Sequence, residues 1–315
     1  MARGGFAVRL AGGPMTQRRQ TMTAHIQTDP RSNLIGSAWM IAAMALFALE
    51  DALLKSASAV IPIWQVLVLF GSGGAVIFAG VAVLRGTRLL QPDVLSPPMK
   101  VRVFFEIFGR LFYVLAIALA PLSSATVILQ ATPLVVVAGA ALFFGETVGW
   151  RRWSAILIGL VGVVIIIQPT GDSFSTLSIL AVLGMLGFAG RDLASRAAPA
   201  SLGTEVLGFY GFLCILVAGL AYRVWESVPM QPLTTHTSLH LTGAIVMGTL
   251  AYASLMKAMR TGEVSAVTPF RYSRLLFGIG LGVFLFDERL DQTMWIGSAL
   301  IVASGLYILW RGRRA

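Results

Sequence analysis

The chain alternates between long apolar runs and short polar or Pro/Gly-rich breaks along almost its whole length. A helix needs about 20 apolar residues to cross a hydrocarbon layer of about 30 Å. The pattern therefore predicts ten membrane-spanning helices. Their approximate bounds are 34–56, 63–84, 101–120, 123–145, 151–168, 177–197, 203–222, 239–259, 264–286 and 293–310.

Two groups of residues recur along the chain at nearly the same spacing. The first group returns 141 residues later: Phe47, Asp51 and Lys55 become Phe188, Asp192 and Arg196. The second returns 142 residues later: Ser123, Phe144, Glu146 and Trp153 become Ser265, Phe286, Glu288 and Trp295. Each half would hold five spans, an odd number, so the second half enters the membrane from the opposite side. We expect two inverted five-helix repeats, at residues 34–168 and 177–310, after a cytosolic tail at residues 1–33.

Composition supports an all-α membrane protein. Hydrophobic residues make up 57% of the chain and charged residues 12%, with mean hydropathy +0.80. A soluble domain carries about 45–50% apolar and about 25% charged residues, so a water-soluble fold is excluded. The net charge of +10 then indicates loops that face anionic lipid, and we expect contact with the bilayer and none with nucleic acid.

Basic residues gather on alternate flanks of the predicted spans. One set of flanks holds 17 Lys and Arg residues, whereas the other holds only Lys55, Arg223 and Arg289. Positively charged flanks are retained in the cytoplasm. We therefore predict that both termini are cytoplasmic, which requires an even number of spans.

The two copies of the second group carry a family resemblance. Phe143-Phe144-Gly145-Glu146 ends the fourth span, and Leu285-Phe286-Asp287-Glu288 ends the ninth. With ten spans in a five-plus-five arrangement, residues 34 to 310 resemble the EamA-type drug/metabolite transporter superfamily, although Asp287 departs from the common Gly-Glu form. The resemblance implies secondary transport of a small organic metabolite through the inner membrane by alternating access. The superfamily includes amino-acid exporters, vitamin importers and nucleotide-derivative carriers, so the substrate stays open.

The ninth span carries two arginines near its middle. Arg271 and Arg274 are three residues apart and share one side of the helix, and no acidic residue inside that span can neutralise both. A charged side chain at this depth needs a partner or a function. Guanidinium groups bind carboxylates or phosphates and stack on flat rings. We predict that both arginines, with Tyr272 between them, contact substrate; pairing with Glu106 or Asp51 is the alternative.

The third and fourth spans add further polar candidates. Glu106 and Arg110 are one helical turn apart and can neutralise each other on one helix face. Alternatively, Arg110 lines the substrate path. Pro133 in the fourth span and Pro269 in the ninth each remove a backbone hydrogen bond inside the helix. Gln130 lies beside Pro133, and we include Gln130 among the substrate-binding candidates.

The duplicated acidic residues suggest gating. Asp51 with Lys55, and Asp192 with Arg196, have the spacing of ion pairs within one helix, and the pattern occurs in both halves. We expect such pairs to close each side of the membrane in turn. Glu50 has no partner of its own in the first span and is the candidate for a coupling carboxylate; Glu106 joins this gating or coupling group.

Other classes of function find less support. The aromatic third span and the segment 271–274 favour a flat polar ligand such as riboflavin, while export of an amino acid or another metabolite is the alternative. A membrane-embedded enzyme would need a catalytic cluster, and the sequence has no triad, phosphate loop or CxxC motif. The histidines lack metal-ligand spacing, so we expect no metal and no cofactor. A homodimer and a monomer both stay open.

Overall fold

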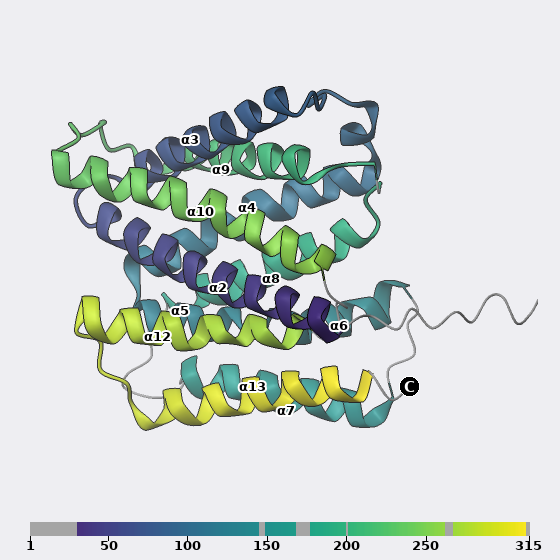
Figure 1. Cartoon of the computed structure of the whole chain (residues 1–315). Coiled ribbons are helices and arrows are strands. Elements are labelled where there is room, and N and C mark those ends of the chain that lie inside the picture. Colours follow the sequence, from purple (N-terminus) through teal and green to yellow (C-terminus); the bar gives the residue numbers. More distant parts are fainter. Residues whose placement is uncertain (1–29, 145–148, 168–176, 200, 262–266, 313–315) are drawn as a thin grey trace, which may run out of the picture.

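The computed structural model describes residues 30–144, 149–167, 177–199, 201–261 and 267–312. Within these ranges the chain is helical and forms no strand. The helices lie side by side and their ends gather at two ends of one bundle (Figure 1). The elements are α2 (Pro30–Ser58), α3 (Ile63–Leu84), η1 (Pro92–Leu95), α4 (Pro97–Leu119), α5 (Leu122–Leu129), α6 (Thr132–Phe144), α7 (Trp150–Ile167), α8 (Ser178–Arg196), α9 (Thr204–Glu226), α10 (Thr235–Thr261), η2 (Thr268–Tyr272), α12 (Ser273–Phe286) and α13 (Gln292–Gly312).

Six helical segments are long and apolar enough to cross a membrane: α2, α3, α5 joined to α6, α8, α9 and α10. The other four predicted spans fall on α4, α7, α12 and α13, which are shorter in apolar length or carry more charge. Helix α4, for example, contains Arg102, Glu106 and Arg110. The chain is thus a multi-pass helical membrane protein. Helix α2 begins at Pro30, earlier than expected, and residues 1–29 of the expected tail lie outside the described residues.

The helices associate in four main pairs. Helix α2 packs along α10, α3 along α9, α4 along α8 and α7 along α13 (Figure 1). Helix α12 lies against α2 and α5. At the α4–α8 crossing, Gly109 and Gly187 meet backbone to backbone, with no room for a side chain on either residue. Small residues allow this close approach in membranes, and it brings the charged residues of α4 next to those of α8.

Two interrupted helices meet inside the bundle. Helix α5 ends at Leu129 and α6 begins at Thr132, while the 3-10 helix η2 precedes α12. The Gln130 side-chain nitrogen donates a hydrogen bond to the Arg271 backbone oxygen at 3.0 Å, which joins the two interruptions. The predicted interruptions near Pro133 and Pro269 are therefore present. Their position next to each other places polar backbone at the same depth as the charged residues.

One end of the bundle, here called the α2–α12 end, is tied by Lys55 and Glu288. The Lys55 ammonium donates to the backbone oxygens of Ile117 (2.9 Å) and Ala120 (2.6 Å) at the end of α4. The Glu288 carboxylate accepts from the backbone nitrogens of Leu122 (2.5 Å) and Ser123 (2.9 Å) and from the Ser123 hydroxyl (2.6 Å). A carboxylate at this position complements the exposed N–H groups and the dipole of α5.

Candidate functional site

Two buried ion pairs lie at the centre of the bundle. Neighbouring carboxylates on α2, Glu50 and Asp51, each have side chains that are 1% exposed. The Arg110 guanidinium on α4 binds Glu50 at 3.0 Å, and the Arg274 guanidinium on α12 binds Asp51 at 2.5 Å. Because burial of an unpaired charge is costly, the two arginines hold α4 and α12 against α2.

Tyr113 completes this group, which we call the central cluster (Glu50, Asp51, Arg110, Tyr113 and Arg274). The Tyr113 hydroxyl donates to Asp51 Oδ2 at 2.8 Å. The same hydroxyl accepts from the Arg274 guanidinium at 3.4 Å. Tyr113 is 1% exposed and lies one turn from Arg110 on α4. Asp51 therefore receives hydrogen bonds from two helices at once.

Aromatic rings flank both central arginines. The Arg110 guanidinium lies 5.9 Å from the Phe70 ring centroid and 5.8 Å from that of Phe188. Arg274 lies 5.2 Å from the Phe47 ring centroid, in addition to its contact with Tyr113. Cation–π contacts of this kind strengthen when water is excluded. The rings add contacts to each guanidinium beyond those of its carboxylate.

A second group joins α4, α8 and η2; we call it the α4–α8 cluster. Glu106 binds Arg102 at 3.3 Å and Arg191 at 3.4 Å. Arg191 also binds Asp192 at 2.8 Å, and Asp192 lies 3.9 Å from the Arg271 guanidinium. The Arg102 and Glu106 side chains are 5% exposed, whereas that of Arg271 is 31% exposed. The cluster thus runs from a buried pair to a half-buried, loosely held one.

The predictions of two ion pairs within single helices are wrong. Asp51 does not bind Lys55, because Arg274 and Tyr113 hold Asp51 while Lys55 donates to backbone oxygens of α4. Glu106 does not bind Arg110 but Arg102 and Arg191. Asp51 is held by partners on other helices, about which a spacing of four residues gives no information. Glu106 binds Arg102 one turn earlier on α4 instead of Arg110 one turn later, together with Arg191 of α8. The expected pair of Asp192 with Arg196 involves a side chain outside the described residues.

Other expectations about partners also change. Glu50, expected to be alone, pairs with Arg110. Arg274 takes the alternative that we named, a bond to Asp51, and Arg271 lies next to Asp192. These pairs explain how the arginines are neutralised, and leave their roles in substrate binding as predictions.

The remaining predicted residues lie at the edges of the two clusters. Gln130 contacts the backbone of Arg271 rather than a guanidinium. Tyr272 is buried, with its hydroxyl against Gly305 of α13, and so faces a different helix from the Arg274–Asp51 pair. Tyr113 and Arg102 were not predicted from the sequence to belong to the site. The only available signal was their position on the helix face of Glu106 and Arg110.

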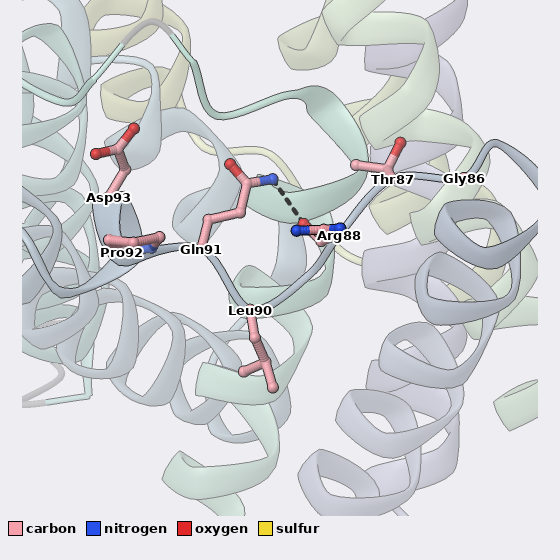
Figure 2. Close-up of a pocket in the computed structure, with 7 residues that line it drawn as sticks. All are labelled: Gly86, Thr87, Arg88, Leu90, Gln91, Pro92 and Asp93. Carbon is pink, nitrogen blue, oxygen red and sulfur yellow. Dashed lines mark hydrogen bonds between the residues drawn. The ribbon is translucent and has the colours of Figure 1, made fainter.

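A hollow of about 710 Å³ lies at the opposite end of the bundle, in the loop from Gly86 to Asp93 that joins α3 to η1 (Figure 2). Its walls come from this single segment, in which the Gln91 side chain donates to the Arg88 backbone oxygen at 2.6 Å. The hollow includes no residue of either cluster. It therefore lacks the contributions from both halves of the chain that the duplication predicts for a transport site.

The chain is similar to a known protein family and to several named relatives. The model of the EamA-like transporter family matches residues 34–168 and 176–310. An S-adenosylmethionine uptake transporter of Rickettsia bellii is 24% identical and aligns over 66% of this chain and 70% of its own. A riboflavin transporter of Rhizobium johnstonii is 24% identical over 94% and 96% of the two chains. A pseudopaline exporter of Pseudomonas aeruginosa is 27% identical over 86% and 95%.

A solved crystal structure has a similar fold, with a TM-score of 0.58 at 22% sequence identity. The similarity covers 89% of this chain and 98% of that chain. The family match spans both halves of the chain, and it confirms the resemblance drawn from the two helix-ending motifs. The chain belongs to the EamA-like transporter family.

Proposed function

We propose that this chain is a secondary transporter of the cell inner membrane that moves a small organic metabolite by alternating access, with the central cluster in its substrate site. The observation that carries the proposal is the pair of buried arginine–carboxylate bridges between α2, α4 and α12. These helices come from both halves of the chain. Ionisable groups inside a membrane protein mark substrate or ion pathways by default.

The arrangement of helix pairs supports ten spans in two inverted halves. If α2 to α7 form the first half and α8 to α13 the second, α3 packs on α9 and α7 on α13, which are equivalent helices. The first helix of each half packs on the third of the other, α2 on α10 and α8 on α4. A two-fold axis in the membrane plane relates inverted repeats, and exchange of first and third helices obeys such an axis. The distribution of basic residues favours cytoplasmic termini.

The α2–α12 end is tied more firmly than the contact between η2 and α8. At the α2–α12 end, Lys55 and Glu288 make five hydrogen bonds to the ends of α4 and α5. In the α4–α8 cluster, the Arg271 guanidinium lies 3.9 Å from the Asp192 carboxylate, and the Asp192 side chain is 25% exposed. The difference supports a state closed at the α2–α12 end, the periplasmic end by the charge rule. Asp51 and Asp192 would then act as gating residues, and Glu50 as a coupling group.

The substrate belongs to one of two chemical classes. Relatives named for S-adenosylmethionine and pseudopaline point to a metabolite with an amino-acid-like part, and those named for riboflavin point to a flat polar ring system. Both classes suit guanidinium groups, which bind carboxylates and stack on rings. No residue arrangement in the described part of the chain favours an enzyme, and no described group of three His, Cys, Asp or Glu side chains could hold a metal.

Uptake into proteoliposomes tests the proposal. The purified protein should accumulate labelled S-adenosylmethionine or riboflavin, and a proton gradient should change the rate if Glu50 couples transport to protons. Arg274→Lys keeps the charge but loses the planar fork, so it should reduce uptake strongly. Arg85→Lys is the matched control, because Arg85 pairs with Glu205 at the other end of the bundle and is 66% exposed. Folded protein that takes up neither of these compounds nor methionine would overturn the proposal.

A further inference from the structure

The two central ion pairs leave part of their hydrogen-bonding capacity unused. Among the described residues, Glu50 Oε2, Asp51 Oδ1, Arg110 Nε and Arg274 Nε are buried and have no hydrogen-bond partner. Arginine and carboxylate can bind through two parallel hydrogen bonds, yet each of these pairs is joined through one guanidinium nitrogen. A buried pair kept only for stability would be expected to fill these positions. The pairs instead retain two donors and two acceptors for another molecule.

The arginines and the carboxylates are held differently. The Arg110 guanidinium contacts the rings of Phe70 and Phe188, and the Arg274 guanidinium contacts the ring of Tyr113; these three rings lie on helices other than α2, whereas Phe47 lies on α2 itself. The two carboxylates are neighbours on one helix, α2, so a shift of that helix relative to α4 and α12 would withdraw both together. The guanidinium groups can therefore stay in place while their partners change.

Charge balance restricts what can take the place of the carboxylates. The four charged groups comprise two cations and two anions. A lone anion bound to the arginines would leave the displaced carboxylates as uncompensated buried charges, each costing about 2.5–3.5 kcal/mol or more. A molecule that carries both signs avoids this cost, because its cation can bind the carboxylates that its anion has displaced.

We propose that Glu50 and Asp51 are internal substitutes for the anionic group of the substrate, and that the substrate is a zwitterion with an α-amino-acid-like end. Its carboxylate binds the Arg110 and Arg274 guanidinium groups, and its ammonium group binds Glu50 and Asp51. The inference rests on the proposed transport function and narrows its substrate class. A flat uncharged ring system such as riboflavin has neither charged group. It would therefore not explain why the pairs Arg110–Glu50 and Arg274–Asp51 can separate.

A ligand series that changes one charge at a time tests the inference on the unmodified protein. Equilibrium binding in lipid nanodiscs would compare S-adenosylmethionine with decarboxylated S-adenosylmethionine, which lacks the carboxylate, and with the 2-oxo analogue, which lacks the amine. All three keep the adenosyl group and the sulfonium. Methionine, methioninamide and the corresponding 2-hydroxy acid form a second, smaller series. In the series that binds, loss of either charged group should weaken binding at least about tenfold, since charge-assisted hydrogen bonds are lost.

Two variants connect the ligand groups to their partners. In Arg274→Gln, the parent zwitterion should no longer bind more tightly than the analogue without a carboxylate. In Asp51→Asn, the parent zwitterion should no longer bind more tightly than the analogue without an amine. The pair Arg85–Glu205, which joins an exposed arginine to a buried glutamate away from both clusters, provides the matched controls Arg85→Gln and Glu205→Gln, which should leave both ratios unchanged.

The outcomes separate this inference from the transport function. Binding and uptake of riboflavin, with no binding of a zwitterion from either series, would overturn the zwitterion inference and leave the carrier intact. Equal binding of the parent compound and its 2-oxo or 2-hydroxy analogue would also overturn it, and would indicate an anion carried with a proton. Absence of any uptake by folded protein counts against the transport function itself.

Discussion

At the scale of single residues, Asp51 depends on contacts that come from far along the chain. It binds Arg274, 223 residues away, and Tyr113, 62 residues away. The sequence places these residues on their helices and shows that charges inside spans need partners. It does not show which partners, because helical spacing relates residues of one helix only. The predicted pair Asp51–Lys55 was wrong for this reason. The predicted pair Glu106–Arg110 was wrong because Glu106 binds Arg102, the other residue four positions away on α4, and Arg191 of α8.

Tyr113→Phe should destabilise the protein without disturbing its packing. The ring remains, but the buried Asp51 carboxylate loses the hydroxyl donor at 2.8 Å. A hydrogen bond to a charged group contributes about 1.5–3 kcal/mol, so we expect the free energy of unfolding to fall by about 2 kcal/mol. Thermal unfolding in detergent measures the effect.

Tyr210→Phe is the matched control for this substitution. Its hydroxyl makes a 3.4 Å bond to the Leu89 backbone oxygen, and the side chain is only partly buried. We expect a change below about 0.5 kcal/mol, as for most substitutions near the surface. If Tyr113→Phe melts no lower than Tyr210→Phe, the Tyr113 hydroxyl does not support Asp51.

At the scale of helices and turns, Glu288 acts on a helix from the other half of the chain. It accepts three hydrogen bonds at the start of α5. In Glu288→Gln the amide keeps one acceptor oxygen but loses the charge that favours a helix N-terminus. We expect a loss of about 1–2 kcal/mol in the free energy of unfolding.

The control for Glu288→Gln is the same change at Asp93, also an acidic residue near a helix start, which accepts from the exposed Ser201 hydroxyl. Asp93→Asn should have little effect on the melting temperature, because that bond is exposed to solvent. If Glu288→Gln and the unmodified protein have the same melting temperature, Glu288 does not stabilise the α2–α12 end.

The backbone conformation at Asp287 is one in which aspartate can stand in place of the common glycine of this motif. Asp287 terminates α12 with φ 51°, a left-handed conformation that glycine adopts most easily and aspartate tolerates. Asp287→Gly should therefore raise the free energy of unfolding, by up to about 1 kcal/mol. A decrease of that size in the same melting assay would mean that the Asp287 side chain makes a contribution of its own. Gly145 and Glu146 of the first motif lie outside the described residues.

Most elements could be predicted from the sequence, since apolar length and Pro or Gly breaks are local signals. The interruptions near Pro133 and Pro269 were predicted for this reason. The hydrogen bond between the two interruptions, from Gln130 to the Arg271 backbone, could not be predicted. It depends on how α5 and η2 pack, which no local pattern records.

At the scale of the whole molecule, the duplication in the sequence predicts two related halves, and the family match spans both halves. The sequence did not predict that the first helix of each half packs on the third helix of the other. That exchange brings α4 to α8 and so assembles the α4–α8 cluster, while the separate contact of α12 with α2 completes the central cluster. Helix packing across the two halves is a property of the assembled molecule.

A cross-link at the α2–α12 end tests whether that end must open during transport. The Lys55 ammonium lies 5.3 Å from the Phe286 ring centroid, so cysteines at these two positions would be within reach of a short bifunctional thiol reagent. The one native cysteine, Cys214, is buried and would be replaced by alanine. Alternating access requires each end to open in turn, and a link between α2 and α12 holds this end shut.

The link between Lys55→Cys and Phe286→Cys should therefore stop uptake. A cleavable reagent should restore uptake when it is cut, while substrate binding from the other end should survive the link. The single variants Lys55→Cys and Phe286→Cys, treated with the same reagent, should keep their activity and so exclude simple modification as the cause. Full uptake by a completely cross-linked protein would show that the α2–α12 end stays closed throughout. Alternating access between the two halves would then be the wrong mechanism for this chain.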